Sequence, residues 1–368
     1  MSETSSPARP AAARRALFAA ALRIVVNGWH LTNRPAWHGS RGDALTLGPA
    51  IRDLAARVDP SLRVFKPYDG QYYYAIAFDP WLRTGEVVPL LDDPAYRYRR
   101  MLLPSLASAL ALGEPRRFPA TLLVINVTAW LACGVLAWRL ARGDELPAPW
   151  LALGTLATTG LVYSTFRTLP EPLSLAFTLG GLHAHRLGRL ALAGSLLGCA
   201  ALAREESLLV TVTLLLFAKL GEGRSARDLV PFSALALLPP LLWWGYLGFV
   251  LPPAATSLAS RISWPFVGLV REGLAAIELN RTPTNLLRSL SVDAVALWLC
   301  LEAFLGIRRS PTLWGVLVLA QALLCAGLRG DVWLYWAGST RVIVPLSVFS
   351  LFWYFERARA GHALPRTG

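Results

Sequence analysis

The chain has 368 residues, of which 54% are hydrophobic and 16% charged. A soluble domain of this size cannot bury so much apolar surface, so the composition predicts a polytopic membrane protein. The formal net charge is +13. The basic residues mostly flank apolar segments and form no basic stripe, which argues against a nucleic-acid-binding protein and is typical of loops that fix membrane orientation.

About ten apolar segments are expected to cross the membrane as helices. The first is short and interrupted by Arg23 and Asn27, and we interpret it as an uncleaved signal-anchor because no small-residue cleavage site follows it. The predicted fold is an all-α polytopic membrane protein with a single transmembrane domain over residues 1–368. The expected spans are about 16–32, 119–139, 150–166, 172–186, 190–203, 207–220, 229–251, 291–307, 311–328 and 340–356.

The orientation follows from the basic residues in the short loops, which are concentrated on one side of the predicted spans. This places both termini in the cytoplasm, with tails at 1–15 and 357–368, and the two long loops, 34–118 and 252–290, outside. Nearly all basic residues are Arg, and Ala and Leu are abundant, which indicates a GC-rich bacterial genome. The predicted location is therefore the bacterial inner membrane. The basic residues that this orientation places on the cytoplasmic side are Arg139, Arg142, Arg186, Arg189, Lys219, Arg224, Arg227, Arg308, Arg309, Arg357 and Arg359.

The first long loop contains an aromatic stretch, Tyr68–Pro80, that predicts a surface helix. Asp69 followed by glycine is a helix-start signal, and Pro80 ends the helix at or before Asp79. Tyrosines suit a helix at the membrane–water boundary. Asp69 is thus either a helix N-cap or a functional carboxylate facing the membrane surface. Farther along, 101–113 is too short to cross a bilayer and is expected to be interfacial or re-entrant.

Further polar groups are expected on the same outer face, in the turns at 167–172, 203–207 and 329–341. Arginine suits phosphate because its planar fork donates two hydrogen bonds and stays charged. A carboxylate such as Asp69 can deprotonate a sugar hydroxyl or hold a divalent cation. A lipid phosphate held at the membrane face beside such a base is a glycosyl-transfer site.

The stretch Tyr-Asp-Gly-Gln-Tyr-Tyr-Tyr-x-Ile-Ala at 68–77 resembles the integral-membrane glycosyltransferases of the GT-C fold, most closely the mannosyltransferase branch related to glycolipid-anchor assembly. Three shorter patches are similar to motifs of that group: Pro170–Leu173, Leu202–Glu205 and Arg341–Pro345. The resemblance implies a long first outer loop with interfacial helices, polyprenyl-phosphate-linked sugar donors, and an acidic loop residue that acts as base or metal ligand.

The resemblance also implies roles for individual residues. Asp69 and Glu171 are the expected catalytic carboxylates, with Mg²⁺ or Mn²⁺ a candidate cofactor at Asp69. Many members of the GT-C group have two adjacent acidic residues where this chain has one, and we expect no soluble C-terminal domain in this sequence, which leaves the metal and the acceptor open. The expected donor-phosphate ligands are Arg341, Arg204, Arg97 and Arg100, and the expected substrate contacts are Tyr68, Gln71 and Tyr72.

Each residue also has a structural alternative. Glu171 suits the start of a helix, where a negative charge is favourable, and Arg341 suits an interfacial arginine whose head reaches water. Arg204 could pair with its neighbours Glu205 or Glu206. The expected function is transfer of a sugar from a polyprenyl-phosphate donor to a lipid, glycan or protein acceptor of the cell envelope. The alternative is a multi-span transporter or lipid flippase, although the span centres are nearly free of charge and no inverted repeat is visible.

Overall fold

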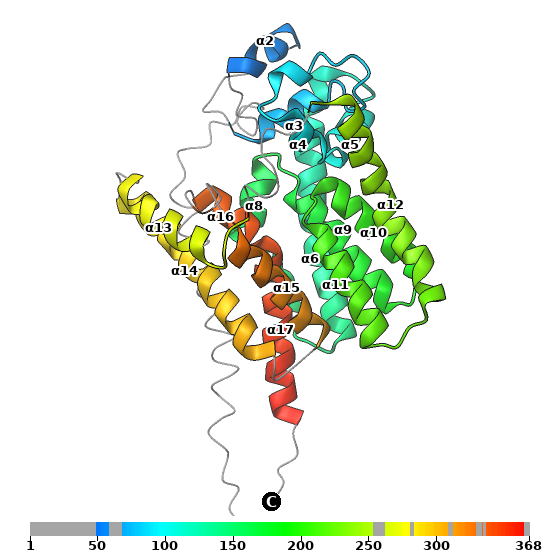
Figure 1. The fold of residues 1–368 in the computed structure, drawn as a ribbon, viewed down its shortest axis with the longest axis vertical. Helices are drawn as coiled ribbons and strands as arrows, with labels where there is room; N and C mark the ends of the chain where they lie inside the picture. The colour runs from blue at the N-terminus through cyan, green and yellow to red at the C-terminus, as the bar shows by residue number, and fades with distance from the viewer. Residues whose placement is uncertain are drawn as a thin grey trace, which may run out of the picture. The chain divides into compact units, whose positions relative to one another are not determined.

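The computed structural model describes residues 49–58, 68–252, 262–279, 283–307, 312–328, 333 and 336–363 (Figure 1). Within these residues the regular elements are helices and no β-strand occurs, which confirms the all-α prediction. The expected first span at about 16–32 and the 1–15 tail lie outside the described residues. The chain divides into two compact units. The prediction of a single domain stays a prediction.

Unit 2 comprises the described residues of Pro35–Cys133 and Leu161–Ile262. It contains the long loop before the first well-defined span and the four helices that follow α8. Its helices are α2 (Pro49–Val58), α3 (Gly70–Ile76), η1 (Val88–Leu90), α4 (Pro94–Tyr98), α5 (Leu102–Leu110), η2 (Pro115–Arg117), most of α6 (Phe118–Gly143), most of α8 (Thr159–Phe166), α9 (Glu171–Arg186), α10 (Leu190–Ala203), α11 (Ser207–Leu220) and α12 (Ala226–Val250).

Unit 1 comprises the described residues of Gly134–Gly160 and Ser263–Gly368. Besides the end of α6, it contains a group of packed apolar helices in which α15 contacts both α14 and α17. Its helices are α7 (Ala148–Leu156), α13 (Val267–Leu279), α14 (Pro283–Gly306), α15 (Leu313–Gly327), α16 (Trp336–Val342) and α17 (Val344–Ala363).

Among the described residues, three helices are long and apolar enough to cross a membrane: Pro115–Gly143, Ala226–Val250 and Ser289–Gly306. These helices are compatible with a membrane protein, whereas about ten spans are not confirmed. Two expected spans are interrupted, because 150–166 falls on α7 and α8, and 340–356 falls on α16 and α17. Pro345 has no N–H to donate to the carbonyl of Arg341, which helps to separate α16 from α17.

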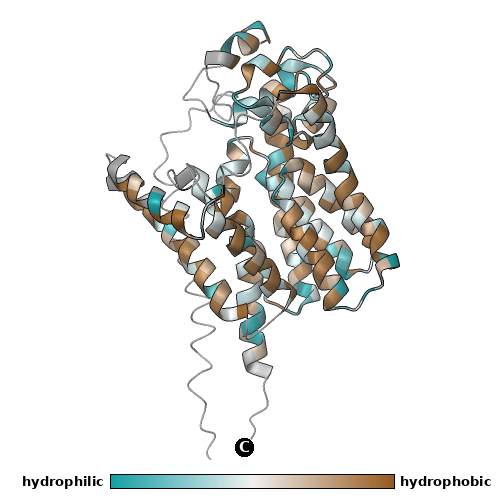
Figure 2. Cartoon of the chain, in the orientation of Figure 1, coloured by the Kyte–Doolittle hydropathy of each residue, from teal (hydrophilic) through white to brown (hydrophobic). Residues whose placement is uncertain are grey.

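The helices of unit 2 pack closely because small residues line α10. A Cβ on Gly194 would lie 2.4 Å from the carbonyl oxygen of Phe232, and one on Gly198 would lie 2.5 Å from that of Leu235. Both carbonyls belong to α12, so α10 and α12 touch through their backbones. Small residues allow such an approach when apolar helices associate. Figure 2 shows that α9–α12 are mainly hydrophobic along their length.

The short helices α3, α4 and α5 lie together at one end of the unit 2 helices (Figure 1). The indole N–H of Trp243 donates to the carbonyl of Tyr98 at 2.8 Å, and that of Trp244 donates to the carbonyl of Arg99 at 3.3 Å. These bonds satisfy carbonyls at the end of α4, which a short helix leaves without intrahelical partners. Helix α12 therefore holds the C-terminal end of α4 in place.

The α10–α12 contact predicts that Gly194→Val destabilises the protein by about 1–3 kcal/mol, because the new side chain meets backbone that cannot move aside cheaply. The measurement is the loss of helical signal on thermal unfolding in detergent. Gly245→Val in α12 is the matched control, because no atom lies within 4 Å of its Cβ position. Equal stability of both variants with the parent protein would contradict the packing described here.

Candidate active site

Asp69 immediately precedes α3, but its side chain does not cap the helix. It occupies the N-cap position with φ −52° and ψ −28°, and the carboxylate makes no capping hydrogen bond. Instead, one oxygen of Asp69 lies 3.2 Å from Nη2 of Arg97 in α4, and its side chain remains 30% exposed. The carboxylate is therefore accessible to a substrate while a cation fixes its position.

Arg97 connects Asp69 to a second carboxylate, Asp92. Its Nε and Nη2 donate to the two oxygens of Asp92, both at 2.8 Å, in the bidentate geometry typical of strong arginine–carboxylate pairs. The guanidinium carbon lies 4.2 Å from the ring centroid of Tyr72 and 5.3 Å from that of Tyr96. We call Asp69, Asp92, Arg97, Tyr72 and Tyr96 the Arg97 cluster.

The interactions within the Arg97 cluster stabilise the ionised forms of Asp92 and Arg97. Burial raises the pKa of Asp92, but the hydrogen bonds and charge of Arg97 outweigh it and lower this pKa below its ordinary value. Burial lowers the pKa of Arg97, and the carboxylates Asp92 and Asp69 raise it overall. Both partners are thus ionised near neutral pH.

The expected metal site at Asp69 remains a prediction. The described part of the chain contains no group of three or more His, Cys, Asp or Glu side chains that could hold a metal ion. Asp69 and Asp92 already flank the guanidinium of Arg97. A divalent cation at Asp69 would therefore lie beside a fixed positive charge.

The backbone next to Asp69 is pressed against the turn between α8 and α9. A Cβ on Gly70 would lie 2.3 Å from the carbonyl oxygen of Arg167 and 2.7 Å from the hydroxyl of Thr168. Thr168 has a φ of +54°, a conformation that is costly for a β-branched residue. Glycine at position 70 is thus required for the close approach of α3 to this turn.

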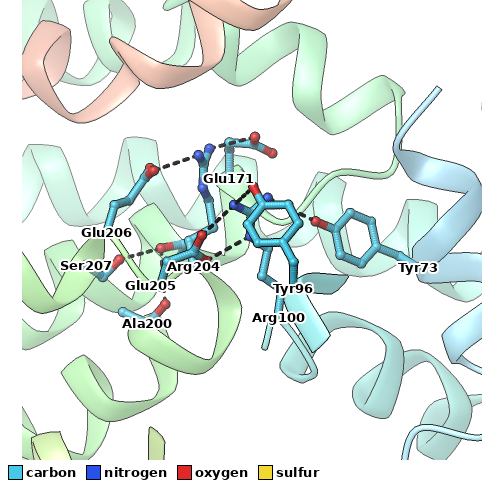
Figure 3. A network of polar contacts seen from close by, with 10 residues as sticks. Tyr73, Tyr96, Arg100, Glu171, Ala200, Arg204, Glu205, Glu206 and Ser207 are labelled. Atoms are coloured by element: carbon cyan, nitrogen blue, oxygen red, sulfur yellow. Dashed lines mark hydrogen bonds and ion pairs between the residues drawn. The ribbon is translucent and has the colours of Figure 1, made fainter. Parts of the chain in front are cut away.

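Arg100 ties the outer loop to the turn between α10 and α11 (Figure 3). Its Nε and Nη2 donate to the two carboxylate oxygens of Glu205 at 2.8 and 2.6 Å. The same guanidinium donates to the hydroxyl of Tyr96 and, at 3.4 Å, to that of Tyr73. Burial raises the pKa of Glu205, but the charge and hydrogen bonds of Arg100 lower it to about 2.

Arg204 forms a second buried ion group beside Glu205. Its Nη1 donates to Glu171 and its Nη2 to Glu206, each at 2.6 Å, and the side chain of Glu171 is only 2% exposed (Figure 3). Burial raises the pKa of Glu206, and the nearby charges of Glu205 and Glu171 act in the same direction. The two neighbouring acids Glu205 and Glu206 thus have opposite pKa shifts.

The structure brings most of the sequence-predicted residues into unit 2. Asp69, Arg97 and Tyr72 share one cluster, whereas Arg100, Arg204 and Glu171 are in the ion groups described above. Gln71 is buried, and Tyr68 packs edge-on against Tyr163 with centroids 5.6 Å apart. Arg341 lies in unit 1, buried in α16, so it is not part of the site described within unit 2.

Several residues of the site were missed or ranked low by sequence reasoning. Asp92 looked like an ordinary loop acid, although its spacing of five residues from Arg97 allows the bidentate pair. Tyr96 and Arg100 are four residues apart, a spacing at which side chains meet along a helical turn. Glu205 is 105 residues from Arg100, and no local pattern indicates their contact.

Gly70→Ala is expected to destabilise the outer loop by about 1–3 kcal/mol, because its methyl group would overlap the Arg167 carbonyl. Hydrogen–deuterium exchange of residues 68–77 would detect faster exchange than in the parent protein. Gly245→Ala, which adds the same methyl group in open space, is the control. Unchanged exchange in Gly70→Ala would show that the approach of α3 to the 167–168 turn is looser than described.

Glu205→Gln and Glu206→Gln are expected to differ in the sign of their effect on stability at pH 7. The depressed pKa of Glu205 means that its ionised form stabilises the fold above the unfolded-state pKa, and this contribution is lost as pH falls toward about 2. Its replacement should cost about 2 kcal/mol, within the range of hydrogen bonds to charged groups. The raised pKa of Glu206 means that its ionised form is disfavoured, so its replacement should be neutral or stabilising.

The measurement for this pair is the apparent melting temperature in detergent from pH 2 to pH 8. The difference between Glu205→Gln and the parent protein should shrink toward the acidic end, because protonation of Glu205 in the parent removes the same interaction. A larger loss of stability in Glu206→Gln than in Glu205→Gln would contradict this assignment of the charges.

Comparison with known proteins gives little constraint. No protein-family model matches the chain, and no solved structure matches it. One stretch is 25% identical over 156 residues, 38% of this chain and 47% of the relative, to "Diacylglycerol acyltransferase/mycolyltransferase Ag85C" of Mycobacterium leprae (strain TN). The chain thus spans about half the length of that relative, and the similarity does not establish a family.

Proposed function

We propose that this protein is a membrane-embedded glycosyltransferase that moves a sugar from a polyprenyl-phosphate donor to an acceptor on the extracytoplasmic membrane face. The class of transferase is the coarsest form of the proposal, and the partial similarity to a protein named an acyltransferase and mycolyltransferase supports no more than that class. The proposal that the transferred group is a sugar rests on the resemblance of residues 68–77 to the GT-C enzymes. The proposed location is the bacterial inner membrane, with both termini cytoplasmic.

One observation carries the proposal: the Asp69 carboxylate is 30% exposed and fixed by Arg97, and it does not cap its helix. In an aspartate that caps a helix, a carboxylate oxygen accepts a hydrogen bond from a backbone N–H group of the first turn. An accessible carboxylate oriented by a cation instead has the properties of a general base. Arg97 covers one face of the Tyr72 ring, so a sugar that packs on this ring would use the opposite face.

In the proposed reaction the Asp69 carboxylate accepts the proton of the acceptor hydroxyl. The acceptor oxygen forms a bond to the anomeric carbon of the sugar as the bond between that carbon and the phosphate oxygen breaks. The electron pair of the broken bond stays on the phosphate, whose developing charge requires nearby cations. Direct displacement of this kind inverts the anomeric configuration.

The remaining predicted residues differ in how buried they are, and we assign their roles accordingly. Glu171 is 2% exposed and paired with Arg204, so we assign it to positioning Arg204. Arg97, Arg100, Arg204 and Arg341 remain the sequence-predicted phosphate ligands, and Tyr68, Gln71 and Tyr72 the substrate contacts. If Mg²⁺ or Mn²⁺ takes part, Asp69 is the residue to hold it. The acceptor can be a lipid, a glycan or a protein.

The test is a transfer assay with purified protein in nanodiscs. Polyprenyl-phosphate hexoses and pentoses are offered with and without EDTA, together with an acyl-lipid donor as a separate arm. Asp69→Asn should lower sugar release about 10²–10⁴-fold, the usual contribution of a general base, without loss of folding or insertion. Asp53→Asn, which neutralises an exposed aspartate on α2, should leave the rate unchanged.

Each alternative has its own outcome in this assay. Wild-type rates in Asp69→Asn would remove the catalytic assignment. Acyl transfer without sugar transfer would replace the sugar with an acyl group as the transferred moiety. Donor flux across proteoliposomes without any bond cleavage would favour the transporter or flippase alternative. Sensitivity to EDTA would show that a divalent cation takes part.

A further inference from the structure

The charges of the unit 2 site leave open which cation meets the donor phosphate. Arg97 contacts Asp69 and Asp92, Arg100 contacts Glu205, and Arg204 contacts Glu171 and Glu206. Each of these guanidinium side chains is less than 10% exposed. A phosphate that used Arg204 would have to break its buried ion pair with Glu171, which is strongly unfavourable. A phosphate that used Arg97 or Arg100 would have to compete with the carboxylates that already pair with them.

Arg167 differs from these three arginines. It lies half-buried in the turn between α8 and α9, and it forms no salt bridge with any carboxylate that the structure describes. Its guanidinium carbon lies 5.8 Å from the ring centroid of Tyr163, a cation–π contact. A cation–π contact does not use the N–H groups in an ion pair, so the guanidinium can still donate hydrogen bonds to an anion.

Arg167 and its partner Tyr163 contact the two residues that flank Asp69 in the sequence, Gly70 and Tyr68. Its carbonyl oxygen is the atom that a Cβ on Gly70 would meet at 2.3 Å. Tyr163, which supports its guanidinium, packs edge-on against Tyr68 with ring planes at 89°. The residues before and after Asp69 thus both contact the structure that holds Arg167.

We propose that Arg167, which contacts Tyr163 through its guanidinium and approaches Gly70 through its carbonyl, binds the phosphate of the lipid-linked donor. The inference rests on the proposed function and adds a residue to its site. Guanidinium suits this ligand because it stays charged and can donate two parallel hydrogen bonds to phosphate oxygens.

The test is a binding measurement without acceptor, using farnesyl phosphate as a short polyprenyl phosphate, farnesol as its phosphate-free analogue, and inorganic phosphate. Arg167→Gln should weaken farnesyl phosphate binding at least about tenfold, with Arg167→Lys between it and the parent protein. Arg117→Gln, which removes the same charge from an exposed outer-loop arginine, should change affinity less than about twofold. Asp69→Asn should retain binding.

Four results would overturn the inference. Unchanged affinity in Arg167→Gln, or no farnesyl phosphate binding by the parent protein, would show that Arg167 is not a ligand. Equal losses in Arg167→Gln and Arg117→Gln would indicate a diffuse effect of charge. Equal affinity for inorganic and farnesyl phosphate would contradict the lipid-linked donor. Since this measurement needs no turnover, its failure leaves the Asp69 assignment to be judged separately in the transfer assay.

Discussion

The guanidinium of Arg97, between the carboxylates of Asp69 and Asp92, is the interaction on which the rest of the site depends. Asp69 pairs with this guanidinium and makes no capping hydrogen bond to α3. The rings of Tyr72 and Tyr96 lie over the same guanidinium. Helix α4, which carries Arg97, is in turn held by the indoles of Trp243 and Trp244 in α12. A candidate span thus helps to position the helix that carries Arg97.

Three buried arginines pair with five carboxylates in this part of unit 2. These pairs differ in how much of each side chain remains exposed to solvent. Glu171 and Arg204 are almost completely buried, so their pairing offsets their own desolvation and orients the start of α9. Asp69 keeps access to solvent, and Arg167 has no carboxylate partner in the described chain. A partly exposed carboxylate and a half-buried guanidinium thus lie on adjacent stretches of backbone, and these are the two groups that the proposed transfer would use.

Local sequence patterns predicted the helical membrane class and the helix start at Asp69–Gly70, because hydrophobic segments and capping signals act over a few residues. They could not predict the pairing of Arg100 with Glu205, 105 residues away, or of Arg204 with Glu171, 33 residues away. The hydrophobic segments also predicted about ten spans. Among the described residues, three helices have the length and apolarity expected of a membrane span. Hydropathy also does not report breaks such as that between α7 and α8.

The most direct test of this account is a double-mutant cycle between Arg97 and Asp69 with the rate of sugar transfer as the readout. If Arg97 acts by orienting Asp69, Arg97→Gln should slow the parent enzyme about 10–100-fold but slow Asp69→Asn by no more than about twofold, because residues that act as one unit are not additive. An equal slowing in both backgrounds would show that Arg97 acts independently of the carboxylate, and it would contradict the central role assigned to this pair.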